Sequence, residues 1–321
     1  MNRRAVGGAA RGAASSLADA GAASAPTPVE VADRIVRSFG SFKTIPEVAL
    51  RATEISSDPS CSLGDLEEVL RRDPTLVSRL LQLVNGPFYG LATEVRSIPQ
   101  ALLVIGLKQL RTLVLVDVAA ALVGAREGVA VSGRALWLHS TAVGVFAQMV
   151  ARRILGVSGD DMFLCGMLHD IGLVLLDQAR GGEVVRAFEA HRSGGGNMCE
   201  CERAALGTDH VHVGVRLAEL WSFPQVVRHA ILHHHDTARY GSGELEPADL
   251  LVVAHHLASE LGYPEIPGHV VAPPEWVLVH VAERELEYRA LAEDFVHEMK
   301  KADRFFQRAP RASRAGAART R

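Results

Sequence analysis

The sequence is poor in cysteine, in aromatic side chains and in net charge. Its 321 residues include four cysteines and 5% aromatic residues, and its formal net charge is -3. Cys61, Cys165, Cys199 and Cys201 have no disulfide-framework spacing, and Cys199-x-Cys201 offers too few ligands for a structural zinc site. We therefore expect reduced thiols. A near-neutral chain also lacks the basic field that general nucleic-acid binding requires.

An uninterrupted hydrophobic run is also missing. The most apolar stretch, residues 101–124, is interrupted by Lys108, Arg111 and Asp117, which favours a buried helix over a membrane span. Residues 1–30 begin with a segment rich in Ala, Gly and Ser that lacks the continuous apolar core of a signal peptide. We expect a disordered tail over residues 1–30 and a cytoplasmic protein that does not associate with membranes.

Convincing alternating strand patterns do not occur, and apolar residues recur instead at helical spacing. Ser62 is placed to cap one helix, and Asp73-Pro74 is placed to open the next, which Asn85-Gly86-Pro87 ends. Residues 98–123 continue the helical pattern in spite of Gly106, and their length favours a helix over a strand. The sequence therefore predicts an all-α fold.

A His-Asp pair stands within an apolar stretch. Residues 163–177 read FLCGMLHDIGLVLLD, with His169 and Asp170 side by side in what the pattern predicts to be a buried helix. A buried pair of this kind requires hydrogen bonds, an ion pair or a metal. Neighbours on a helix point about 100° apart, so the two side chains would reach a common ion only at its margin.

Further histidines are spread over several predicted helices. His139, His210, His234 and His235 could converge with the His-Asp pair, because stacked helices can each deliver one or two ligands to a metal. A simpler interpretation remains open for each histidine alone. His139 could serve packing, and residues 233–235 could form a solvated helix end where positive charge suits the helix dipole.

The arrangement of these motifs resembles a known family. MLHDIG at residues 167–172 follows LWLHS and precedes LGTDHVHVGVRLAELWSFP and HAILHHH, a series that looks like the HD superfamily of all-helical metal-dependent phosphohydrolases. The earlier segment RRDPTLVSRLLQLVNG and its continuation are similar to the N-terminal half of the HD-related output domain, HDOD, a bacterial signalling module. The resemblance spans residues 42–261.

The resemblance implies an HDOD domain over residues 31–265. Within it, a helical N-terminal lobe at 31–125 packs on an HD-like helical bundle at 130–265. By position, the resemblance implies metal ligands at His139, His169, Asp170, His210, His234 and His235, with His169 and Asp170 as the candidates for a catalytic role. The implied cofactor is a divalent metal, either iron, manganese or zinc.

Two departures favour regulation over catalysis. The superfamily has an Asp where this chain has His255 in VVAHHLA, and imidazole supplies neither the charge nor the bridging oxygens of a carboxylate. The segment after His235, DTARYGSGELEPADL, also has no recognisable match to the GYP extension of cyclic dinucleotide phosphodiesterases. We therefore expect a regulatory protein that transmits a signal by binding another protein, without established catalysis. The alternative is a metal-dependent phosphohydrolase acting on a nucleotide or cyclic dinucleotide.

The C-terminal part extends beyond the resemblance. Residues 266–306 carry apolar side chains, among them Val277, Leu286 and Phe295, at the spacing of an appended amphipathic helix that docks on the core. Residues 307–321 form a basic segment, which we expect to be a solvated tail. It is the one part of the chain for which nucleic-acid contact stays a hypothesis.

Overall fold

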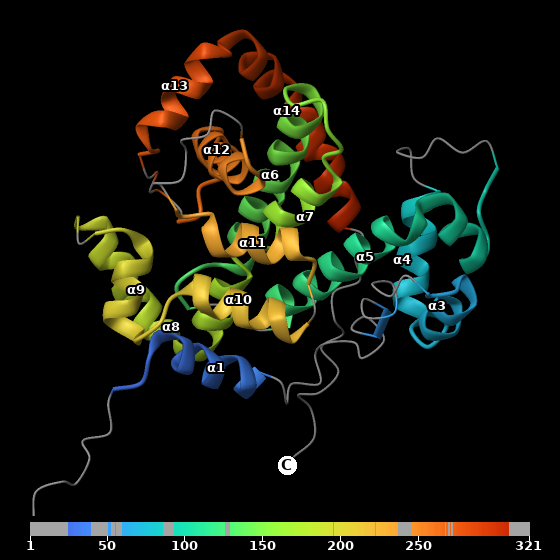
Figure 1. Ribbon diagram of the computed structural model, residues 1–321, viewed down its shortest axis with the longest axis horizontal. Coiled ribbons are helices and arrows are strands. Elements are labelled where there is room, and N and C mark those ends of the chain that lie inside the picture. The colour runs from blue at the N-terminus through green and yellow to red at the C-terminus, as the bar shows by residue number, and fades with distance from the viewer. Residues whose placement is uncertain are drawn as a thin grey trace, which may run out of the picture.

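The chain forms an assembly of helices joined by turns (Figure 1), and the residues that the structure describes include no strand. This computed structural model describes residues 25–39, 51–52, 55, 60–85, 93–125, 129–194, 196–221, 223–236, 245–266, 268, 270 and 272–307. The all-α prediction is confirmed. The predicted tails fall largely outside the described residues, although α1 (Pro28–Phe39) begins within the predicted N-terminal one.

Two of the first helices begin at the predicted capping residues. Before α3 (Leu63–Leu70), the Ser62 hydroxyl accepts a hydrogen bond from the Asp65 N–H, and the Asp65 carboxylate accepts one from the Ser62 N–H, both at 3.1 Å. Asp73 accepts a bond from the Leu76 N–H at 3.0 Å at the start of α4 (Pro74–Val84). Short polar side chains therefore satisfy backbone donors that helix starts leave free.

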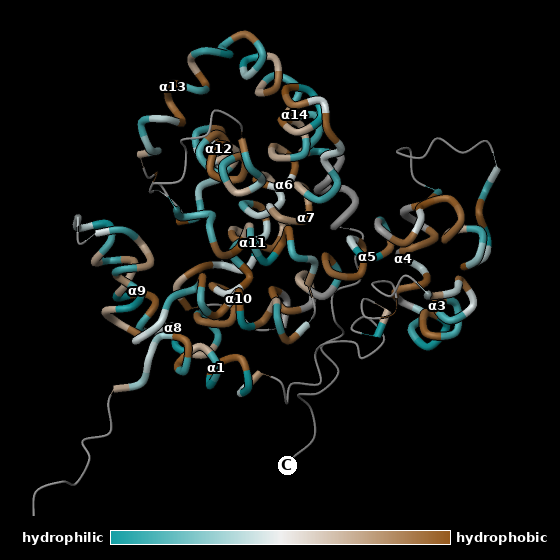
Figure 2. The backbone as a smooth tube through the Cα atoms, viewed as in Figure 1, coloured by the Kyte–Doolittle hydropathy of each residue, from teal (hydrophilic) through white to brown (hydrophobic). Residues whose placement is uncertain are grey.

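The helix predicted over residues 98–123 is broken at Gly106. α5 (Ile98–Ala125) covers this stretch, but Gly106 has φ 72° and ψ 170°, a conformation open to glycine because it lacks a Cβ. The prediction of one continuous helix is wrong here, since the apolar pattern continues across the break (Figure 2) and does not report backbone angles. α5 contacts α3 and α4 as well as the helices that follow it, so it joins two parts of the fold.

His169 and Asp170 lie in a turn and not within a helix. α7 (Asp160–Leu168) ends directly before them, and α8 (Ile171–Arg192) begins directly after them. The prediction of a single helix is wrong. The apolar residues on both sides indicate burial, but they do not indicate a turn of two residues. The turn also frees the two side chains from the 100° separation that a helix would impose.

Five more helices surround this turn. Their bounds are α6 (Gly133–Arg153), α9 (Met198–Leu206), α10 (His210–Leu220), α11 (Gln225–His233) and α12 (Pro247–Glu260). Gly207 ends α9 with a left-handed φ of 75°, and Asp209 caps α10 by accepting a bond from the His212 N–H at 2.8 Å. α1 packs against α10 and α8, where the Asp33 carboxylate pairs with Arg216 at 2.5 Å.

Two glycines allow helices to approach closely beside the turn. A Cβ on Gly166 of α7 would lie 2.4 Å from the Gly144 Cα of α6, and a Cβ on Gly172 of α8 would lie 1.9 Å from the His210 carbonyl oxygen of α10. Any side chain at these positions would push the helices apart. The two contacts bring α6 and α10 up to the His169-Asp170 turn from two directions.

The C-terminal extension consists of two helices, whereas the sequence predicts one. α13 (Glu275–Glu283) and α14 (Glu285–Gln307) meet at Arg284, whose φ and ψ are -126° and 35°. Phe295 packs against Phe146 of α6 with ring centroids 5.3 Å apart, so docking on the core is confirmed for α14. Leu286 does not join this face, because its side chain is 77% exposed.

One helical stretch has the length and apolar composition of a membrane span. It runs from Asp160 to Arg192, across the turn, and 83% of its apolar window is buried inside the protein. The bent α5 meets the same criteria only when its two parts are counted together. Burial against other helices gives a core helix this composition without any membrane.

Gly172→Ala is expected to destabilise the fold by about 1–3 kcal/mol, because the added methyl group would overlap the His210 carbonyl oxygen. Gly182→Ala on the same helix is the matched control. Its methyl group would meet nothing within 4 Å, so the higher helix propensity of alanine should stabilise the protein by about 0.5–1 kcal/mol. Urea unfolding measures both effects. Equal stability of the two variants would contradict the close approach of α8 and α10.

Candidate metal centre

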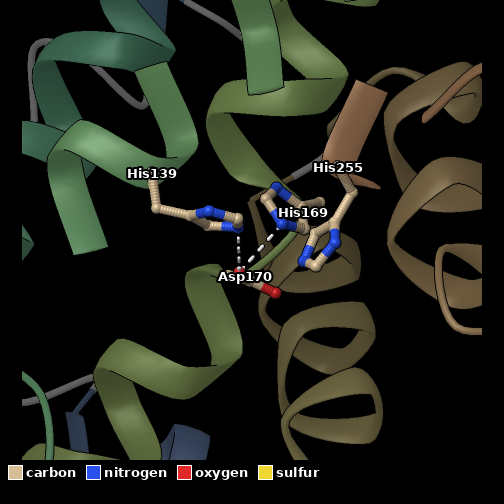
Figure 3. Close-up of side chains that lie close together, drawn as sticks. All are labelled: His139, His169, Asp170 and His255. Atoms are coloured by element: carbon tan, nitrogen blue, oxygen red, sulfur yellow. Dashed lines mark ion pairs between the residues drawn. The ribbon is translucent and has the colours of Figure 1, made fainter. Parts of the chain in front are cut away.

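Seven side chains converge on the turn between α7 and α8. They form two groups that share Asp170, and within each group the potential ligand atoms lie within 4.8 Å of one another. Site A consists of His139, His169, Asp170 and His255, and Figure 3 shows these four side chains facing a common point. Site B consists of Asp170, His210, His234 and His235. The donors thus come from α6, the turn, α10, the end of α11 and α12.

The two carboxylate oxygens of Asp170 face different sites. Oδ2 lies 2.8 Å from His169 Nε2 and 3.4 Å from His139 Nε2, the two contacts drawn in Figure 3. Oδ1 lies 3.3 Å from His234 Nε2 and 3.8 Å from His210 Nε2. One carboxylate therefore stands between two sets of imidazoles and presents one oxygen to each.

The second nitrogen of several of these rings is fixed by a hydrogen bond. The Nδ1–H groups of His139, His169 and His234 donate to the backbone carbonyls of Tyr263, Gly166 and Ile231 at 2.7, 2.8 and 2.7 Å. His210 Nδ1 donates to Glu202 Oε2 at 2.6 Å. A ring that donates from Nδ1 turns Nε2 toward Asp170, so each Nε2 is placed to hold either a proton or a metal ion beside the carboxylate.

The converging atoms fit a metal ion. Among the described residues, Nε2 of His139, His169 and His255 and both oxygens of Asp170 are buried without any hydrogen-bond partner. In site B, His210 Nε2 lies 3.0 Å from His235 Nε2 and 3.2 Å from His234 Nε2. Lone pairs this close repel unless a proton or a cation lies between them. The donor set is compatible with a divalent metal, and imidazole with carboxylate suits zinc, iron or manganese.

Burial and mutual charge set the protonation of the rings. Burial, followed by the neighbouring imidazoles, holds the pKa of His235 well below its ordinary value. Burial opposes the charge of His210 as well, but the Glu202 carboxylate outweighs it and raises the pKa of His210 to about 10. In site A, burial opposes the charge of His139, but Asp170 outweighs it and raises the pKa of His139, whereas burial lowers the pKa of His169.

Access to the centre is limited. His139, His169, Asp170, His210 and His234 are all buried, whereas the rings of His235 and His255 are partly exposed and lie 6.2 Å apart. Two further carboxylates lie buried around the centre, Glu202 at His210 and Glu265 with Oε2 3.7 Å from His255 Nε2.

All six residues predicted from the sequence are brought together in sites A and B. The solvated-end interpretation does not hold for His234, which is buried and faces Asp170, as His139 also does. His255 stands where the superfamily has an aspartate, and it was not among the predicted ligands. In the structure it is one of the potential donors of site A. Glu202 and Glu265 were also missed. Glu202 falls on the apolar face of α9 between Cys199 and Leu206, which is the one pattern that could have indicated its burial.

Comparisons with known proteins agree with this architecture. Residues 42–237 match the HDOD domain family. An uncharacterised protein of Treponema pallidum (strain Nichols) is 27% identical over 213 residues, which make up 64% of this chain and 39% of that protein. The chain therefore spans well under half the length of that curated relative.

Solved structures share the fold. An HDOD domain protein of unknown function from Geobacter sulfurreducens superposes with a TM-score of 0.60 at 21% identity, covering 84% of this chain and 98% of its own. A protein of Shewanella amazonensis SB2B, described as a candidate phosphohydrolase, has a TM-score of 0.61 at 23% identity and covers 86% and 97% of the two chains. At these identities the likeness shows the fold alone.

Asp170→Asn is expected to remove bound metal from both sites, because the shared carboxylate supplies an oxygen to each. His255→Ala should lower only the occupancy of site A. His212→Ala is the matched control, since His212 also lies on α10 but its ring bonds Asp209, away from both sites. Elemental analysis of protein purified without a His-tag measures metal per chain. Equal metal content in Asp170→Asn and wild type would contradict the assignment.

Metal binding is expected to release protons and to strengthen as pH rises. His210, with a pKa of about 10, holds a proton on Nε2 in the metal-free protein at neutral pH, and a metal ligand must be unprotonated. Calorimetry in buffers of different ionisation enthalpy counts the protons released. Glu202→Gln removes the charge that raises the His210 pKa, so it should release fewer protons. A binding enthalpy independent of buffer would contradict this expectation.

Proposed function

The chain belongs to the HDOD domain family, and we propose that it is a metal-binding regulatory protein that transmits a signal by contacting another protein. The number of donors carries this proposal. Sites A and B each offer four protein donors. Four protein ligands complete the tetrahedral coordination of structural zinc, whereas catalytic zinc sites keep one position open for water or substrate.

The residues of both sites would hold divalent ions as a cross-link between helices. When bound, such ions would supply a fixed positive charge beside the buried carboxylate of Asp170. The Nδ1 hydrogen bonds keep the rings oriented with Nε2 toward Asp170, so little rearrangement is needed on binding. Metal occupancy would therefore rigidify the junction of α6, α10 and the α7–α8 turn.

The packing of the helices supports transmission from this junction to the N-terminal part. α10, which begins with His210, packs against α1, and α7, which ends beside His169, packs against α5. α5 in turn contacts α3 and α4. A change in metal occupancy would thus alter the support of helices that lead away from the centre, where a partner protein could contact them.

A second function, metal-dependent phosphohydrolysis, is favoured by one observation. Asp170 presents one oxygen to each site, and hydrolases with two metals use such a shared arrangement to hold both attacking and leaving oxygens. Iron or manganese accept more than four ligands and would leave positions open in both sites. The similar structure from Shewanella amazonensis SB2B is described as a candidate phosphohydrolase.

Turnover and hydrogen exchange together test the two functions. Protein loaded with zinc, iron or manganese is assayed against phosphomonoesters, nucleotides and cyclic dinucleotides, with Asp170→Asn as the inactive reference. Regulation predicts no hydrolysis above that reference. It also predicts slower amide exchange in α1 and α5 on metal loading, absent in Asp170→Asn. Hydrolysis lost only in Asp170→Asn would establish the enzyme, and protection confined to α6 through α12 would contradict transmission.

The cytoplasm is the compartment that fits this function. Cys61, Cys165, Cys199 and Cys201 form no disulfide in the part of the chain that the structure describes, which fits a compartment where thiols are kept reduced. A signalling partner in the same compartment is part of the proposal.

A further inference from the structure

A third group of donors lies behind site B. Cys199 and Glu202 are three residues apart on α9, and His210 begins α10. Their Sγ, carboxylate and imidazole atoms lie within 4.8 Å of one another, and all three residues are buried. The group touches site B through His210 alone, and it faces the opposite edge of that ring.

Glu202 has an oxygen without a partner. Its Oε2 accepts hydrogen bonds from the His210 N–H at 2.9 Å and from His210 Nδ1 at 2.6 Å. Its Oε1 is buried, and among the described residues no donor bonds it, although Glu202 is 0% exposed. A buried carboxylate oxygen left without a donor or a cation is destabilising. The unpartnered oxygen belongs to the carboxylate that stands beside the Cys199 thiol.

We propose that Cys199, Glu202 and His210 form a third cation site, site C, that takes a thiophilic divalent ion such as zinc. Thiolate, carboxylate and imidazole together form a donor set that zinc and cobalt accept. Two negative ligands would balance the charge of a divalent ion. On binding, the Cys199 thiol and His210 Nδ1 each release a proton to solvent, and the ion takes the place of the hydrogen bond between Glu202 and Nδ1.

Site C goes beyond the proposed function and does not compete with it for atoms. His210 Nε2 faces Asp170, His234 and His235, whereas Nδ1 faces Glu202. With ions on both edges, His210 would have released both ring protons to solvent and would bridge the two ions as an imidazolate. The alternative is that Glu202 only orients His210 for site B, in which case the thiol never contacts a metal.

A thiolate bond to the metal distinguishes these two cases. Burial, followed by Asp209 and Glu202, raises the pKa of the Cys199 thiol, so the thiol keeps its proton unless a cation displaces it. Cobalt(II) reports the bond directly, because thiolate coordination produces an intense near-ultraviolet charge-transfer band that nitrogen and oxygen ligands do not.

The experiment is an anaerobic cobalt(II) titration of the full chain and two variants. Wild type and Cys201→Ser are expected to develop the thiolate band, and Cys199→Ser is expected to lose it and to bind less cobalt. Cys201 is the matched control, because it lies two residues further along α9 and is also buried, but belongs to none of the three donor groups. Circular dichroism shows whether each variant is folded.

Two outcomes would overturn site C. Folded wild type without a thiolate band excludes the site whatever the variants do, and a band that persists in Cys199→Ser assigns the thiolate to another cysteine. The Asp170→Asn variant tests site C independently of sites A and B. If Asp170→Asn retains the thiolate band, site C forms without the shared carboxylate, even where the metals of sites A and B are lost.

Discussion

The buried carboxylate of Asp170 is the constraint on which the centre depends. A lone charge in a dry interior is strongly destabilising, so Asp170 requires positive charge or hydrogen bonds from groups that reach it. The imidazoles of His139, His169, His210 and His234 face it at 2.8 to 3.8 Å, yet none bonds its oxygens with hydrogen-bond geometry. Burial opposes the charge, and the histidines outweigh it and hold the pKa of Asp170 well below its usual range. Cations bound between the imidazoles and the carboxylate would neutralise the charge of Asp170 and give its oxygens bonding partners.

The surrounding helices hold the imidazole rings close to Asp170. Gly166 and Gly172 remove the Cβ atoms that would separate α7 from α6 and α8 from α10, and the chain reverses between them at His169 and Asp170. Backbone carbonyls and Glu202 then fix the tautomers of the rings. The centre is therefore preorganised by the backbone, and the helices that carry it pack in turn against α1 and α5. A regulatory protein requires such packing to transmit a change at the metal centre. A site whose ligands all come from the protein favours this role over catalysis, because it leaves no position open for substrate.

Much of this could be predicted from the sequence, because helix caps and ligand motifs are local. Ser62 and Asp73 marked helix starts, and the histidine motifs predicted six donors that the fold brings together. His255 was missed because a template based on position expects a carboxylate there, whereas any side chain that reaches site A with a lone pair can serve. The break at Gly106 and the turn at His169-Asp170 escaped detection, since hydrophobic periodicity reports burial and not backbone angles. Glu202 and Glu265 depend on contacts between separate segments, which a single sequence does not display.

Anomalous diffraction from a crystal grown with zinc tests the central claim most directly. Data collected on both sides of the zinc absorption edge locate each ion without assumptions about ligands. Two peaks are expected to flank Asp170, one beside Oδ2 among His139, His169 and His255, and the other beside Oδ1 among His210, His234 and His235. A single peak, or none within reach of Asp170, would contradict the shared carboxylate and with it the two-site centre.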